Sequence, residues 1–259
     1  MDMGIAGRLA LVMGSSQGLG LASAQALARE GARVILTGRD AARLEAACAT
    51  IRATGGTVEA RVVDFADAAQ VATLLEGLAD TAIDILVTNG GGPPPGPIAD
   101  VAPEVWQAQF DRMVTVPLRI VQAVLPGMRA RGWGRIVNIV SSGVVQPIPN
   151  LGISNTLRMG LIGWAKTLAT EVAADGVTVN SVVPGRIHTT RVDQLDAAAA
   201  GRTGKTVEEV AAASRATIPM RRYGHPDEFA AAVCFLSSAV ASYMTGSMMR
   251  VDGGMIRSC

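Results

Sequence analysis

The sequence predicts an α/β fold in which helices cover both faces of a doubly wound parallel sheet of about seven strands. Short, continuously apolar runs alternate with longer segments of helical period along most of the chain. This alternation is typical of a parallel sheet covered by helices. A glycine-rich turn joins the first apolar run to the first helical segment. Because no linker rich in proline or serine divides the chain, we expect one domain over residues 1–259.

The expected strands read as continuous hydrophobic runs, as strands buried on both faces of a sheet do. Each of them except the first follows a segment with helical or turn-forming character. In chain order they span residues 9–13, 33–37, 58–63, 83–88, 135–140 and 177–183, with a short last strand at 248–251.

Between these strands, apolar residues recur at the spacing of one helix face. A proline inside a helix removes a backbone hydrogen bond, so Pro117 indicates that residues 103–131 form two helices. The helical segments span residues 18–30, 41–53, 68–79, 103–131, 151–174 and 226–237.

Residues 184–222 interrupt this regular alternation between the sixth strand and the last helix. Excursions of this length in compact domains are usually lids or binding loops, so we expect a substrate loop here. The alternative is a helical hairpin on the surface.

Composition and charge narrow the classes of function. Apolar residues make up 49% of the chain and charged residues 17%, which is typical of a globular protein. The 23 basic and 22 acidic residues give a net charge of +1 with no block of like charge, which argues against nucleic acid or an acidic membrane as a partner. No apolar stretch approaches about 18 residues, and the start of the chain lacks the features of a secretory signal. We therefore expect a soluble, cytoplasmic protein.

The cysteines and histidines offer no metal site. Cys48, Cys234 and Cys259 are odd in number and widely spaced, and the two histidines add no ligand spacing. We expect no metal and no disulfide framework. Cys48 and Cys234 lie on helical patterns and are expected in or near the core, whereas Cys259 is a terminal thiol.

The turn after the first strand points to a dinucleotide. Glycines there allow a tight turn and let the backbone approach a pyrophosphate, whose charge the helix N-terminus stabilises. Placed between the first strand and the first helix, this turn predicts a cofactor site of the Rossmann type. Its candidate cofactor-binding residues are Gly14, Ser16, Gln17, Gly18, Leu19 and Gly20.

The end of the second strand indicates which dinucleotide is bound. An acidic residue about twenty positions after the glycine turn would hold the ribose 2′-hydroxyl of NAD. Here Gly38 and Arg39 come first, and Asp40 is placed to cap the following helix. A guanidinium can grip a 2′-phosphate with two hydrogen bonds, so Arg39 favours NADP(H) over NAD(H).

Further motifs lie at the ends of later strands and near the C-terminus. They are Asn89-Gly90-Gly91-Gly92, the segment 184–189, the spaced set Pro219, Arg222, Gly224, Pro226 and Glu228, and Val251-Asp252-Gly253-Gly254. Together with the glycine turn, they resemble the motifs of the short-chain dehydrogenase/reductase family, in particular its 3-oxoacyl-(acyl-carrier-protein) reductase branch, over nearly the whole chain. The resemblance implies further cofactor contacts at Asp64, Phe65, Asn89, Gly90, Pro184, Gly185, Ile187 and Thr189.

The family's catalytic pattern is only partly present. Its members use a Tyr-x-x-x-Lys pair after the fifth strand, with a serine and an asparagine on an earlier helix. Aligned on residues 163–169, this chain has Ser154 at the tyrosine position and Arg158 at the lysine position. Met113 stands at the asparagine position, and the serine is matched by Ser141 or Ser142. The resemblance also places Arg158 beside the cofactor.

This substitution changes the chemistry available. An aliphatic hydroxyl is a much weaker acid than tyrosine, and arginine stays charged but can stabilise an oxyanion. Proton delivery would then fall to a relay of Ser142, Ser154, Arg158 and water, or to His188 if its loop brings it close. A histidine that faces solvent is the alternative for His188.

Three functions remain open. The first is an NADP(H)-dependent reduction of a carbonyl, or oxidation of the matching alcohol, in a small molecule or acyl thioester. The second is cofactor binding with little or no catalysis, as in a sensor or an oligomer partner. The third is a non-redox enzyme similar to a halohydrin dehalogenase, which the intact glycine turn disfavours. The resemblance also implies a homotetramer or homodimer built on the helices at 103–131 and 151–174.

Overall fold

A computed structural model, which describes residues 2–258, contains one parallel sheet of seven strands. Its order is β3-β2-β1-β4-β5-β6-β7, so the chain runs outward from β1 in one direction and then outward from β4 in the other. This confirms the predicted doubly wound fold. The strands are β1 (Leu9–Val12), β2 (Arg33–Gly38), β3 (Val58–Val62), β4 (Ile85–Thr88), β5 (Gly134–Ile139), β6 (Val177–Pro184) and β7 (Met248–Val251).

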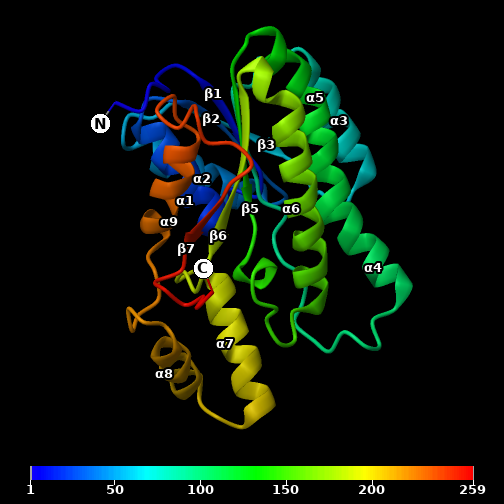
Figure 1. Cartoon of the computed structure of the whole chain (residues 1–259), viewed down its shortest axis with the longest axis vertical. Helices are drawn as coiled ribbons and strands as arrows, with labels where there is room; N and C mark the ends of the chain where they lie inside the picture. The colour runs from blue at the N-terminus through cyan, green and yellow to red at the C-terminus, as the bar shows by residue number, and fades with distance from the viewer. Residues whose placement is uncertain (1, 259) are drawn as a thin grey trace.

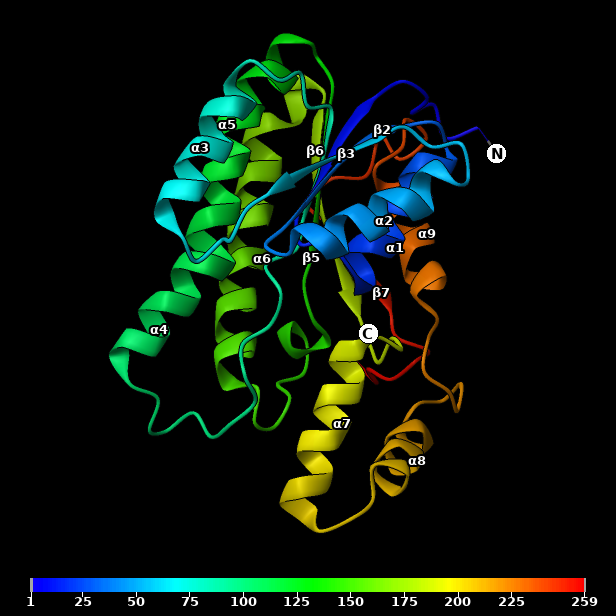
Figure 2. The ribbon, with the colours of Figure 1, turned by 180° about the vertical axis from the view of Figure 1, so that it is seen from behind.

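Helices cover both faces of the sheet (Figure 1, and from behind in Figure 2). Helices α1, α2 and α9 lie on one face, and α3, α5 and α6 lie on the other. The helices are α1 (Gly18–Arg29), α2 (Ala41–Arg52), α3 (Ala68–Ala79), α4 (Pro103–Phe110), α5 (Val116–Ala130), α6 (Gly152–Val172), α7 (Thr190–Thr203), α8 (Val207–Thr217) and α9 (Pro226–Leu236), with short 3-10 turns η2 (Ser142–Val144) and η3 (Ala173–Asp175).

The alternation of side chains along β1 explains why this strand is apolar throughout, whereas β3, at the edge of the sheet, contains Glu59 and Arg61. Ala10 and Val12 are fully buried in the core beneath α1, α2 and α9. Leu11 and Met13 are fully buried in the second core, beneath α3, α5 and α6. A polar residue at any of these positions would therefore lose its hydration in one core or the other.

The predicted break in residues 103–131 is present, but it begins before Pro117. A π-helical turn, η1 (Asp111–Thr115), separates α4 from α5. Pro117 then occupies the first turn of α5, where a missing backbone N–H is tolerated. The wider turn places Met113 and its neighbour Arg112 beside the loop that follows β4, since a Cβ at Gly90 would lie 3.2 Å from the Cα of Met113.

The excursion at residues 184–222 contains a helical hairpin, as in the alternative to a substrate loop, and a role in substrate binding stays a prediction. Helices α7 and α8 extend below the sheet, beyond the carboxyl ends of the strands (Figure 1). Gly204 ends α7 in a left-handed conformation with φ of +68°. Thr206 then starts α8, because its side chain and that of Glu209 cap each other's backbone N–H groups.

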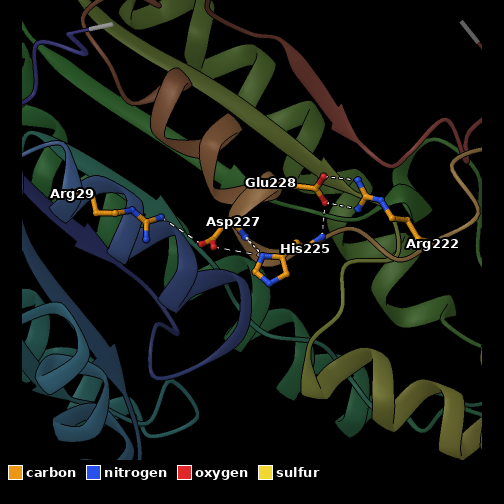
Figure 3. A network of polar contacts seen from close by, with 5 residues as sticks. All are labelled: Arg29, Arg222, His225, Asp227 and Glu228. Carbon is orange, nitrogen blue, oxygen red and sulfur yellow. Dashed lines mark hydrogen bonds and ion pairs between the residues drawn. The ribbon is translucent and has the colours of Figure 1, made fainter. Parts of the chain in front are cut away.

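A network of ion pairs fixes the segment that leads into α9 (Figure 3). Arg222 donates hydrogen bonds of 2.7 and 2.6 Å to the two carboxylate oxygens of Glu228. Glu228 also accepts a 2.6 Å bond from the backbone N–H of His225, the residue that caps α9. Asp227 pairs with Arg29 of α1 at 3.4 Å. These contacts hold the start of α9 against α1.

Two further expectations concern the cysteines and membranes. Cys48 and Cys234 are free thiols buried in the core, as predicted, whereas Cys259 lies outside the described residues. In the stretch from residue 2 to residue 258, no helix combines the length and apolar character that crossing a bilayer requires.

Candidate functional site

The glycine turn forms a backbone cradle at the carboxyl end of β1. Gly14 and Gly18 have φ values of +55° and +61°, a region that side chains other than glycine rarely adopt. A Cβ at Gly20 would overlap the carbonyl oxygen of Gly14 and lie 3.0 Å from the Asn89 amide nitrogen. Only a residue without a side chain fits there, so the start of α1 can approach the end of β1 closely.

The start of α1 is available to bind an anion. The first backbone N–H groups of a helix have no partner within the helix. Among the described residues, no side chain caps α1, whose N-cap is the exposed Gln17. Leu19 packs against the core and holds the first turn in place. Ser16 lies over Gly38, whose added Cβ would be 3.4 Å from the serine hydroxyl, so the cradle reaches the end of β2.

The ends of β4 and β6 close the cradle. Asn89 donates a 3.1 Å hydrogen bond to the carbonyl of Gly14. Thr189 covers the other side, since a Cβ at Gly18 would lie 3.8 Å from the Thr189 methyl carbon. Gly185 is held by a 2.9 Å backbone bond from its N–H to Val251, and Ile187 is buried. The structure thus brings Pro184, Gly185, Ile187, Thr189, Asn89 and Gly90 to the same edge of the sheet as the glycine turn.

The end of β2 carries a free positive charge. Arg39 is exposed and forms no ion pair within residues 2–258. Asp40 accepts a 3.0 Å bond from the N–H of Arg43 and caps α2, as predicted. After β3, Asp64 accepts a 3.0 Å bond from the N–H of Ala66, and Phe65 packs partly buried against the core.

Ser154 and Arg158 form a buried pair one helical turn apart on α6. The Nε–H of Arg158 donates a 3.2 Å hydrogen bond to the Ser154 hydroxyl oxygen. Its Nη1 donates to the Ile139 carbonyl at 2.8 Å, and its Nη2 donates to the Gly91 carbonyl. Arg158 therefore links α6 to the ends of β5 and β4. Among the described residues, no acceptor is bound to the Ser154 proton, which is left to donate.

The charge of Arg158 is enclosed by protein. The side chain is only 7% exposed, and none of its three acceptors is a carboxylate. Burial, together with the nearby positive charges of Arg191 and Arg112, lowers the pKa of Arg158 from 12.5 to about 10. At neutral pH the group remains a cation, and its hydrogen bond to Ser154 makes that hydroxyl a stronger acid.

Ser141 and Ser142 begin the turn after β5. The Ser141 hydroxyl accepts a 3.1 Å bond from the N–H of Gly143, and Ser142 is buried. Asn155 of α6 packs its Oδ1 against Gly143, where no side chain could be accommodated. That oxygen is buried without a partner among the described residues. Asn155 is therefore a polar group at the site that the sequence motifs do not indicate.

His188 does not join this group of residues. Its side chain is exposed, and its Nε2 lies 3.4 Å from a carboxylate oxygen of Asp193. Its ring centroid is 6.4 Å from that of Tyr223. Both residues line a pocket of about 510 Å³ between α7, α8 and residues 222–225. His188 therefore faces solvent, as in the alternative given above.

The sequence analysis missed two arginines beside the loop that follows β4. Arg191, in the first turn of α7, donates a 2.6 Å hydrogen bond from Nη2 to the carbonyl of Pro93. Arg112, in η1, has a buried Nε without a partner within residues 2–258. Neither residue belongs to a local motif. In the sequence, only their position could have indicated them, because each arginine lies in a segment that follows the carboxyl end of a strand.

Comparison with known proteins agrees with this geometry. Residues 14–256 match the family profile described as enoyl-(acyl carrier protein) reductase. The chain is 34% identical to the 3-oxoacyl-(acyl-carrier-protein) reductase FabG of Vibrio cholerae, over 98% of this chain and 99% of that protein. It is 35% identical to human dehydrogenase/reductase SDR family member 4, over 96% and 88%. L-sorbose reductase from Gluconobacter frateurii, solved with NADPH and L-sorbose, superposes with a TM-score of 0.93 at 35% identity over both full chains.

Proposed function

The chain belongs to the short-chain dehydrogenase/reductase family of oxidoreductases, and from this premise we propose that it uses NADP(H) to reduce a carbonyl group. The substrate is a small molecule or an acyl thioester, and the reverse reaction oxidises the matching alcohol. The observation that carries the proposal is the buried Ser154–Arg158 pair at the same edge of the sheet as the glycine cradle. Two relatives support this substrate class. One is a 3-oxoacyl-(acyl-carrier-protein) reductase, and the other is an L-sorbose reductase that was solved with NADPH and L-sorbose.

The residues of the cradle fit a dinucleotide. The positive φ of Gly14 and Gly18 and the lack of space for a Cβ at Gly20 leave backbone N–H groups to hold the pyrophosphate. Asp64 and Phe65 would contact the adenine, and Arg39 would pair with the 2′-phosphate, which would select NADP(H) over NAD(H). The other residues predicted to contact the cofactor are Ser16, Gln17, Leu19, Asn89, Gly90, Arg158, Pro184, Gly185, Ile187 and Thr189.

The proton step belongs to Ser154 and Arg158. When bound, NADPH supplies the hydride that reduces the carbonyl carbon. The Ser154 hydroxyl donates its proton to the carbonyl oxygen as negative charge develops there. Arg158 stabilises the charge left on Ser154 through its Nε–H, and water returns the proton. Ser141 or Ser142 orients the carbonyl from the turn after β5.

A weak acid at the proton-donor position restricts the substrates. Serine donates a proton much less readily than tyrosine, so the best substrates form an alkoxide that is easily stabilised. Carbonyls activated by a neighbouring group, such as 1,2-diketones, quinones and 3-oxoacyl thioesters, should be reduced faster than simple ketones.

A panel of carbonyl compounds tests this proposal. Consumption of NADPH and of NADH is followed spectroscopically with simple ketones, 1,2-diketones, quinones and a 3-oxoacyl thioester. We expect turnover of the activated compounds with NADPH only. No turnover with any compound, while titration shows that NADPH binds, would favour a cofactor-binding protein without catalysis. Failure to bind NADPH would contradict the cofactor assignment itself.

Assembly forms part of the proposal. Val105 and Phe110 of α4 and Met159 of α6 are large apolar side chains that the single chain leaves exposed. Burying such side chains between copies is favourable, so we infer a homodimer or homotetramer of single-domain subunits built on these helices. Size-exclusion chromatography with light scattering measures the mass of the assembly in solution. A monomer at micromolar concentration would contradict this proposal.

A further inference from the structure

Three arginines lie beside the loop that follows β4, and of these Arg112 is also influenced by the negative charge of Asp64. Ten other arginines in the described chain pair with Asp or Glu. Within residues 2–258, Arg112, Arg158 and Arg191 form no such pair, although Arg158 is buried and the other two are partly buried. The arrangement is unusual because buried charges are normally paired.

The loop itself lets these guanidinium groups come close. Arg158 donates to the carbonyl of Gly91 and Arg191 to the carbonyl of Pro93. A Cβ at Gly92 would lie 3.1 Å from Nη2 and 3.3 Å from Nε of Arg191. Glycine at position 92 therefore leaves room for the Arg191 guanidinium to lie flat against the backbone. Both cations, from α6 and α7, therefore contact the same short loop, and Arg158 also contacts Ser154.

The positive charges repel one another. Burial is the largest cause that lowers the pKa of Arg158 and of Arg191. The charges of Arg191 and Arg112 lower the pKa of Arg158 further, and the charge of Arg112 lowers the pKa of Arg191 further. Burial and the positive charge of Arg39 lower the pKa of Arg112, and the carboxylate of Asp64 opposes this shift. An anion bound among them would relieve this repulsion, because each guanidinium has more N–H donors than its present contacts use.

The phosphates of the cofactor account for only part of this charge. The glycine cradle provides backbone donors for the pyrophosphate, and Arg39 lies at the end of β2 assigned to the 2′-phosphate. Arg158 and Arg191 lie instead at the end that contains Ser154, where the carbonyl reacts. The cofactor phosphates, placed in this way, leave these two positive charges without an anion.

We propose that the substrate is a carboxylate, specifically a 2-oxo or 3-oxo acid, whose carboxylate group is bound by Arg191 together with Arg158. This inference rests on the proposed carbonyl reduction and narrows its substrate class. Arg191 determines specificity through the carboxylate, and Arg158 lies between that group and the proton donor Ser154. The uncharged analogue of the same shape leaves both guanidinium groups without an anion, and so it binds poorly.

Matched substrates and variants test the proposal. A 2-oxo acid and its primary amide have nearly the same size and differ in charge. We expect wild-type kcat/KM with NADPH to favour the acid by about 10- to 100-fold, the range of a charge-assisted hydrogen bond. Arg191→Gln should remove most of that preference by lowering kcat/KM for the acid much more than for the amide, and NADPH should still bind. Arg202 lies exposed on the same helix and forms no ion pair with another described residue, so Arg202→Gln is the matched control and should behave as wild type.

A binding measurement separates this inference from the proposed reaction. Oxalate or malonate, which cannot be reduced, should raise the melting temperature of wild type and Arg202→Gln in the presence of NADP⁺, but not that of Arg191→Gln. If 1,2-diketones are reduced while acid and amide are equal and oxalate has no effect, the inference is wrong and the reductase stands. A stabilising effect of oxalate without any turnover supports the anion site and refutes the reductase. Loss of NADPH binding in Arg191→Gln would assign that arginine to the cofactor and overturn the inference.

Discussion

Replacement of Arg39 by alanine tests the choice of cofactor. The guanidinium is exposed, follows β2 directly and has no carboxylate partner within residues 2–258, so its removal breaks no ion pair in the protein. Hydrogen bonds to charged groups contribute about 1.5–3 kcal/mol. Because solvent screens an exposed pair, we take the lower end, about 1.5 kcal/mol, which corresponds to roughly a tenfold change in affinity.

Fluorescence titration of NADPH and NADH measures this effect. We expect the Kd of Arg39→Ala for NADPH to rise about tenfold, while the Kd for NADH stays within about twofold of wild type, since NADH has no 2′-phosphate. Arg33→Ala, an exposed arginine at the opposite end of the same strand, is the control and should change neither value. Equal weakening of both cofactors, or no change in either, would refute the pairing of Arg39 with the phosphate.

Three other predictions concern the cradle, the α9 network and the thiols. Gly20→Ala should weaken NADPH binding by on the order of 100-fold, because the new Cβ would overlap a backbone carbonyl and displace the turn. The same titration measures this effect, and an unchanged affinity would contradict the role of the cradle. Hydrogen bonds from Arg222 lower the pKa of Glu228 from 4.5 to about 2, so the ionised group stabilises the fold above pH 4.5 and this contribution is lost as the pH falls toward 2. Denaturation of wild type and Glu228→Gln should therefore differ at pH 6 and converge near pH 2, and a constant difference would be inconsistent with this pair. Burial raises the pKa of the Cys48 thiol, and it raises the pKa of the Cys234 thiol to about 11. In the Cys259→Ser variant, a thiol reagent at pH 8 should therefore label neither residue until denaturant is added.

The fold could be predicted from local patterns because the central strands, such as β1, show their burial in their own composition. Ala10 to Met13 are apolar on both faces, and this feature needs no knowledge of what packs against them. The glycine turn is equally local, since the conformation of Gly14 and Gly18 depends on the turn itself. The division of residues 103–131 was anticipated from Pro117, but a proline does not specify that a π-helical turn precedes it.

The arginine cluster could not be predicted in the same way. Arg112, Arg158 and Arg191 come from three elements far apart in the sequence, and they meet only because the carboxyl ends of β4, β5 and β6 adjoin in the sheet. Only Arg158 stands in a recognisable motif. The hairpin at 190–217 escaped a firm prediction because its two helices are alanine-rich and partly exposed, and its start is tied to the site by tertiary contacts of Arg191 and Thr189.

The role of Ser154 as proton donor is the central claim, and the most direct test is the kcat/KM of Ser154→Ala with a 1,2-diketone and NADPH. Thr156→Ala, an exposed hydroxyl residue on the same helix, is the control. We predict that Ser154→Ala lowers kcat/KM by about 100-fold or more, the usual contribution of a general acid, with the Kd for NADPH unchanged and Thr156→Ala active. Turnover by Ser154→Ala at the wild-type rate would contradict the account and place the proton donor elsewhere.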